Sequence, residues 1–157
     1  MKKLILFSFL ISGLLSGQTF DVGKKINVVQ QHETKTDFGA ITFKPSLYFW
    51  KVNIENTTSE NVIIDWDKTT FVIQGKSSGV VFNDTIKMLI NQPKGKEVIA
   101  PNSTLTKEIY PKEKAEYMFP LFSKKDVEKG RITDIVINLN FEPDRNISTV
   151  FKIEINK

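Results

Sequence analysis

Residues 133–155 read TDIVINLNFEPDRNISTVFKIEI and carry the clearest structural signal in the chain. On either side of the polar turn at residues 142–146, apolar and polar side chains alternate with a period of two, which is the pattern of a strand with one buried and one wet face. We therefore predict an antiparallel hairpin. The side chains predicted to face inward are Thr133, Ile135, Ile137, Leu139 and Phe141 before the turn, and Ile147, Thr149, Phe151, Ile153 and Ile155 after it.

A similar alternation at residues 48–67 predicts a second hairpin, with a polar turn at residues 56–61. Trp50 and Trp66 would then face each other across this hairpin as core residues. Asp65 and Asp67 would project from the opposite, exposed face. The side chains of the predicted apolar face are Tyr48, Trp50, Val52, Ile54, Val62, Ile64 and Trp66.

Shorter apolar runs predict further strands. Seven to nine short strands, with turn residues about every ten positions, indicate an all-β fold, and specifically an antiparallel β-sandwich. One helical connection is expected at residues 123–129, because Ser123 has the spacing of a capping residue and Gly130 favours a helix stop. The weaker strand candidates are residues 25–33, 70–74, 80–82, 86–90, 105–110 and 117–119.

Three segments resemble the immunoglobulin-like β-sandwich domains of exported bacterial proteins of unknown function. They are Val52-Asn53-Ile54-Glu55-Asn56-Thr57-Thr58, Val62-Ile63-Ile64-Asp65-Trp66 and Ile99-Ala100-Pro101-Asn102-Ser103. In such domains a strand ends at an Asn-Thr turn, its hairpin partner follows, and a Pro-Asn-Ser turn opens a strand of the other sheet. The resemblance implies the same immunoglobulin-like sandwich and brings no catalytic residue with it. Antibody-type domains also pair two cysteines across their sheets, and this chain has none.

The N-terminus predicts a secretory signal peptide at residues 1–17. A basic start is followed by a largely apolar run of twelve residues, 4–15, and then by the small residues Ser16 and Gly17. We place the cleavage after Gly17, which leaves residues 18–157 as a single domain. The apolar run is shorter than the about 20 residues of a spanning helix, so no membrane span is expected after cleavage. Without cysteine no lipoprotein anchor is expected either, and the predicted location is periplasmic or secreted.

Charge and cysteine content narrow the range of partners. Without the two leader lysines, the 22 basic residues become 20 against 18 acidic ones, and the two signs are interleaved along the chain. Such a surface lacks a single-sign stripe that could neutralise phosphates, so a nucleic-acid partner is not expected. A cysteine-free exported chain favours a bacterial origin, with packing supplying the stability that disulfides supply elsewhere.

No catalytic, cofactor or metal site is predicted. His32 is the single histidine and no Gly-x-Ser-x-Gly elbow is present, so His32 is interpreted as a polar residue on the wet face of an early strand. Zinc sites need a cluster of three or four ligands, which one histidine and no cysteine do not provide. Asp65 and Asp67 could hold calcium or act on a sugar as acid and base, but solvation of a strand end is the preferred interpretation.

Aromatic side chains and sequons complete the set of candidate features. Exposed rings would indicate a carbohydrate platform, whereas rings on apolar strand faces indicate a core. Core, second-layer or edge packing is the preferred interpretation for Phe38, Tyr48, Phe49, Trp50, Trp66 and Tyr110. Four residues begin Asn-x-Ser/Thr sequons and are all predicted to lie in turns: Asn56, Asn83, Asn102 and Asn146.

These patterns favour a non-enzymatic exported module that binds or scaffolds a protein or glycan of the bacterial cell envelope through its loops or an edge strand. Residues 18–33 are the candidate edge strand for exchange with a partner. The alternative is a carbohydrate-binding module, with or without a structural calcium, which needs exposed aromatic rings on one sheet face. A hydrolase would need Asp65 or Asp67 in a concave pocket with another acid or His32.

Overall fold

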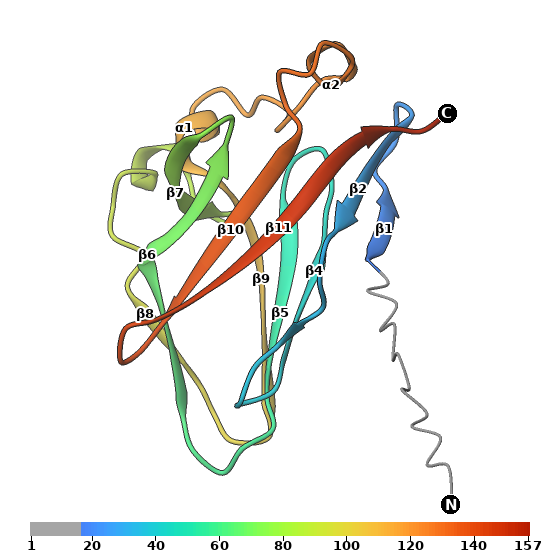
Figure 1. Cartoon of the computed structure of the whole chain (residues 1–157). Coiled ribbons are helices and arrows are strands. Elements are labelled where there is room, and N and C mark those ends of the chain that lie inside the picture. Colours follow the sequence, from blue (N-terminus) through green and yellow to red (C-terminus); the bar gives the residue numbers. More distant parts are fainter. Residues whose placement is uncertain (1–16) are drawn as a thin grey trace, which may run out of the picture.

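The computed structural model describes residues 17–157, so the predicted leader lies outside the described residues except for Gly17. Its strands form a single curled antiparallel sheet (Figure 1). The prediction of an all-β fold is therefore confirmed. The strands are β1 (Gln18–Asp21), β2 (Ile26–Gln30), β3 (Thr34–Lys35), β4 (Ala40–Lys44), β5 (Trp50–Asn56), β6 (Val62–Ile73), β7 (Lys76–Phe82), β8 (Lys96–Ile99), β9 (Ser103–Pro111), β10 (Asp134–Phe141) and β11 (Arg145–Ile155), and the short helices are η1 (Lys87–Leu89), α1 (Lys112–Ala115) and α2 (Lys124–Glu128).

The sheet is curled because β7 belongs to two ladders. The strand order is β1-β2-β11-β10-β6-β7-β9-β5-β4-β3, and β8 pairs with β6 beside this path. Residues 76–79 of β7 pair with β6, whereas residues 80–82 pair with β9. β7 thus joins a first arm, which runs from β1 to β6, to a second arm, which runs from β9 to β3. Figure 1 shows the first arm in front of the second.

The hairpin predicted at residues 133–155 is confirmed. β10 and β11 pair in register from Asp134 opposite Lys152 to Phe141 opposite Arg145. The side chains of β10 alternate between buried and half-buried or exposed, as the period of two requires. Thr133 is the exception, since it precedes the strand and is exposed.

The hairpin predicted at residues 48–67 is wrong. β5 pairs with β4 and β9, whereas β6 pairs with β10, β7 and β8. Residues 57–61 therefore cross from the second arm to the first. Both strands turn an apolar face to the same core from opposite sides, and alternation alone does not separate this case from a hairpin. The burial of the two tryptophans is confirmed, because Trp50 and Trp66 are 0% and 1% exposed.

Aromatic rings fill the space between the arms. The Trp50 ring meets the rings of Phe71 and Phe151 edge-on, with centroid distances of 6.1 and 4.8 Å. Phe43 of β4 packs edge-on against Phe151 at 5.1 Å. Edge-to-face pairs of this kind stabilise a core beyond the area they bury. Because each pair joins a strand of one arm to a strand of the other, these contacts hold the arms together.

Two of the weaker strand predictions are wrong. Residues 86–90 contain η1, and residues 117–119 form a loop after α1. Apolar runs of three to five residues do not specify a strand by periodicity alone. The runs at residues 25–33, 70–74, 80–82 and 105–110 do fall on β2, β6, β7 and β9. No strand was predicted at the positions of β3, β4 and β8.

The short helix predicted at residues 123–129 is confirmed by α2. The Ser123 hydroxyl accepts a hydrogen bond from the Asp126 backbone N–H at 3.2 Å, which is the expected N-cap contact. Gly130 follows with a positive φ of 63°, the conformation that ends many helices. Capping chemistry was thus sufficient to place this element.

Candidate functional site

A large bulge interrupts β6 and sets the direction of its two acidic side chains. Asp65 lies opposite Asn140 and Thr70 opposite Asn138, so four residues of β6 stand against Leu139 alone. Such bulges disrupt the ladder and re-aim side chains. Asp65 is consequently buried, at 5% exposure, and its predicted exposure is wrong. Asp67 is exposed, as predicted.

The two carboxylates are occupied by N–H donors. Oδ1 of Asp65 accepts the Asp67 backbone N–H at 3.1 Å. Oδ1 and Oδ2 of Asp67 accept the backbone N–H groups of Lys94 and Gly95, at 2.7 and 3.0 Å. Each Asp67 oxygen thus already accepts one backbone hydrogen bond. Within residues 17–157 no group of three or more acidic or histidine side chains could hold a metal ion. Asp67 instead ties the loop at residues 94–95 to the bulge.

His32 is separated from these acids by two strands, because it follows β2, and β11 and β10 lie between β2 and β6 in the sheet. It is exposed in a bend after β2, and its carbonyl oxygen accepts a hydrogen bond from Nε2 of Gln30 at 2.7 Å. Its predicted exposure is confirmed, although β2 ends two residues earlier. β1, the outermost strand of the first arm, pairs with β2 alone, so only the first part of residues 18–33 forms the edge.

The aromatic residues weighed as a carbohydrate platform are mostly buried. Trp66 donates its indole N–H to Oε2 of Glu97 at 2.6 Å, and Trp50 donates its own to the Ser46 carbonyl at 2.8 Å. These bonds satisfy the polar end of each buried ring. Phe38 and Tyr110 are buried, Phe49 is half-buried, and Tyr48 is 43% exposed. The tryptophans therefore do not form a sugar-stacking surface.

Two loops carry an exposed apolar surface that the sequence analysis had interpreted as strands. We call it the loop patch. Its residues are Ile86, Met88 and Leu89 around η1, and Tyr117, Met118 and Phe119 after α1. The loops touch, because Nζ of Lys87 lies 5.7 Å from the centre of the Tyr117 ring. Figure 1 shows the loop of η1 beside α1, at one end of the molecule. Met88 is 88% and Tyr117 is 66% exposed, so these side chains stand in solvent.

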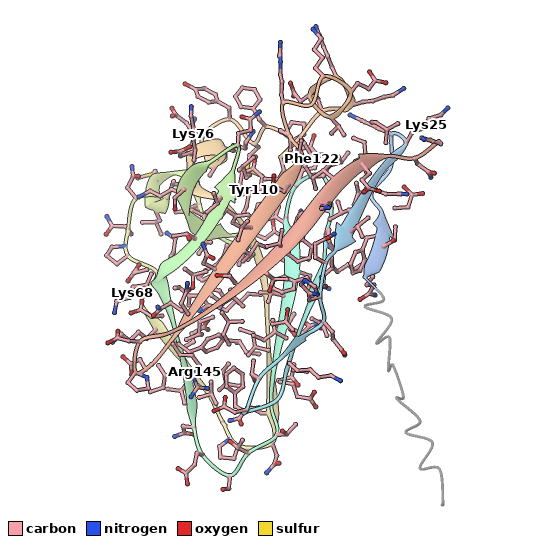
Figure 2. All side chains as sticks on the ribbon, viewed as in Figure 1. Lys25, Lys68, Lys76, Tyr110, Phe122 and Arg145 are labelled. Carbon is pink, nitrogen blue, oxygen red and sulfur yellow. The ribbon has the colours of Figure 1, made fainter. Side chains whose placement is uncertain are left out.

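Tyr110 fixes one of the two loops to the core. Its hydroxyl donates to the Phe119 carbonyl oxygen and lies 3.4 Å from that of Lys114. The backbone N–H of Leu121 donates to the Leu47 carbonyl at 2.8 Å, just beyond the patch. In Figure 2, Tyr110 and Phe122 lie toward the end of the molecule that carries α1. The patch is thus presented on an anchored loop.

Tyr110 also supplies a test in alkaline solution. Burial raises its pKa to about 12, whereas a tyrosine of the unfolded chain titrates near pH 10. Its proton therefore stabilises the fold fully below about pH 10, and this stability is lost as the pH rises through about 12. We expect urea unfolding to show a loss of roughly 2 to 3 kcal/mol in the wild type that is missing in Tyr110→Phe. Equal losses in both proteins would contradict this role.

The four sequon asparagines divide into two groups. Asn83, Asn102 and Asn146 are exposed. Asn83 and Asn102 lie in turns as predicted, whereas Asn146 is the second residue of β11, so its predicted place in a turn is wrong. Asn56 is 0% exposed and is the last residue of β5, so its predicted place in a turn is wrong. Its side chain is enclosed because it bonds to the segment after β5 and to the segment at the end of β8. A buried amide is not a site that a glycosyltransferase can reach in the folded chain.

Comparison with known proteins adds no relative. No protein-family model matches the chain, and searches of the curated proteins and of the solved structures find no match. Among the described residues, no helix is both long and apolar enough to cross a membrane.

Proposed function

We propose that this chain is a non-enzymatic, exported binding module of the bacterial cell envelope, and that the loop patch contacts its protein partner. The observation that supports this is the gathering of six exposed large apolar side chains on two touching loops. Contiguous apolar surface on a soluble protein marks an interaction site. Single exposed apolar residues such as Val98 and Val150 are ordinary and need no such explanation.

The composition of the patch favours a protein as the partner. Methionine and aromatic residues are enriched at the centres of protein interfaces, where methionine adapts its shape to the opposite surface. Residues 85–90 carry Lys87 and no acidic residue, so the rim of the patch on this side is positive. A partner with an apolar centre and an acidic rim would complement this surface.

The proposal extends to the setting of the domain. We infer that residues 1–17 are a leader that directs residues 18–157 to the periplasm or the exterior. We also infer that the two facing arms represent an immunoglobulin-like sandwich whose loops carry the binding function. Loops on a rigid β scaffold commonly carry recognition in this way, because they tolerate change without loss of the core.

A photoreactive residue at position 88 would test the contact directly. We expect ultraviolet irradiation of expressing cells to yield one discrete protein adduct from position 88. The matched control is position 98, where Val98 is 59% exposed on β8, away from the patch. Adducts of equal yield at both positions, or adducts with lipid alone, would contradict the proposal. Tyr117→Ser should lower the affinity for the partner found in this way by about tenfold or more.

A further inference from the structure

A cavity of about 280 Å³ lies between the bulge of β6 and the end of the loop that carries η1. Its size is close to the lower limit of small-molecule sites. The residues that line it include Trp66, Asp67, Val80, Ile90, Lys94 and Lys112. Strand bulges recur next to binding sites because they re-aim side chains, and here the bulge brings Trp66 and Asp67 to the cavity wall.

The negative charge in this wall is already engaged. Asp67 accepts the backbone N–H groups of Lys94 and Gly95 through its two oxygens. The Gly95 carbonyl in turn accepts the Trp66 backbone N–H at 2.9 Å. These three bonds fix residues 94–95 against the bulge, and Asp67 therefore serves to shape the cavity.

Two lysines give the wall an excess of positive charge. Nζ of Lys94 donates to the carbonyl oxygens of Gln92, Leu89 and Ile90, at 2.9, 3.0 and 3.4 Å, so its contribution to the cavity is its charge. Lys112 comes from α1 and lies over Gly79, where a Cβ atom would be 4.0 Å from its Cδ. Burial, and then the neighbouring Lys112 ammonium group, lower the pKa of Lys94. Both lysines are half-buried, and two half-buried cations beside one engaged carboxylate attract an anion.

We propose that this cavity binds a sugar-sized ligand through a negatively charged group placed beside Lys94 and Lys112. Val80 and Ile90 offer apolar contact to the body of such a ligand. Asn91 and Gln92 also line the cavity, and both residue types carry amide donors and acceptors for hydroxyl groups. A few polar groups set in a partly apolar wall are typical of small-molecule sites.

This site is independent of the loop patch and of the protein partner proposed for it. The two surfaces share one loop, but the patch uses Ile86, Met88 and Leu89, whereas the cavity uses residues 90–94. A failure to find a ligand would leave the patch proposal intact. Equally, the absence of a protein adduct from position 88 would not affect the cavity.

The test uses the purified chain and three sugars of similar size: glucose, glucuronate and glucose 6-phosphate. We expect the charged sugars to bind and glucose not to bind. Because Trp66 lines the cavity and Trp50 lies in the core, the Trp66 indole N–H resonance should shift and that of Trp50 should not. The two charged sugars distinguish a carboxylate from a phosphate as the recognised group, and binding of either supports the site.

Lys112→Gln removes one charge, and Lys114→Gln on the same helix is the matched control. Since a hydrogen bond to a charged group is worth about 1.5 to 3 kcal/mol, we expect Lys112→Gln to weaken binding by about tenfold or more. Lys114→Gln should leave the affinity within about twofold. Glucose binding as well as the charged sugars, no shift with any sugar, or equal affinity of Lys112→Gln and wild type would each overturn the proposal.

Discussion

Replacing Gly39 with alanine is expected to lower the free energy of unfolding by at least about 3 kcal/mol. A Cβ atom at this position would overlap the carbonyl oxygen of Glu55 and lie 3.0 Å from its carbonyl carbon. Both atoms belong to the backbone of β5, so no flexible side chain can move aside. Chemical denaturation of the two proteins, monitored by tryptophan fluorescence, measures the difference.

The backbone around Gly39 explains why the strand cannot simply retreat. The Thr57 backbone N–H donates to the Phe38 carbonyl at 2.8 Å, and the Gly39 carbonyl accepts from the Thr36 backbone N–H at 2.9 Å. Moving Gly39 away from β5 would strain or break these bonds. The matched control is Gly75→Ala, where φ is also positive, at 72°, but no atom lies within 4 Å. Conformational strain alone should then cost about 1 to 2 kcal/mol. Equal losses at the two glycines would contradict the overlap.

Asn56→Asp is expected to destabilise the protein by about 3 to 5 kcal/mol at neutral pH. Nδ2 of Asn56 donates toward the carbonyl oxygens of Glu60 at 2.7 Å, Ile99 at 3.0 Å and Ala100 at 3.2 Å. An aspartate of the same shape would point a charged oxygen at these three acceptors in a buried site. One oxygen would keep the Thr58 backbone N–H and hydroxyl as donors, but the oxygen in place of Nδ2 would be buried without a donor.

Acid should narrow the gap between Asn56→Asp and the wild type. A buried carboxyl that faces carbonyl oxygens is more stable when protonated, because it can then donate one hydrogen bond. The unfolded aspartate keeps its ordinary pKa near 4, so the variant should approach the wild type in stability as the pH falls toward that value. Asn102→Asp, at an exposed residue of a turn, is the control, and we expect an effect within about 0.5 kcal/mol. Thermal unfolding across this pH range tests both expectations, and a gap that is constant with pH would contradict the arrangement around Asn56.

Period-two alternation was enough to predict the class of the fold and the pairing of β10 with β11. In that hairpin the second strand follows the first after a short turn, so the local sequence is enough to predict the pairing. The pairing of β5 and β6 was mispredicted for a reason that lies outside the local sequence. Asn56 bonds to residues 99–100, more than forty positions away, and these contacts help to send the chain across to the other arm.

The candidate sites were not visible in the sequence, and the physical cause differs for each. The residues of the loop patch lie in apolar runs that resemble strands. Only the strand pairing of the folded chain shows that these runs have no strand to pair with. The cavity depends on the bulge in β6, which breaks the alternation that identified the strand. Its two lysines are 18 positions apart in the sequence, and no motif links them. One signal was available: residues 91–93 read Asn-Gln-Pro, a turn-forming run that predicts a loop at this wall of the cavity.

The division of β7 between two ladders bears on how the chain folds. If either arm opened alone, one half of this strand would lose its hydrogen-bonded neighbour while the other half kept it. The bend between the two halves would then no longer be held by hydrogen bonds on both sides. Folding intermediates with a single finished arm are accordingly disfavoured. The backbone amides on both sides of residue 79 should exchange with solvent at one common rate, set by global unfolding of the whole chain.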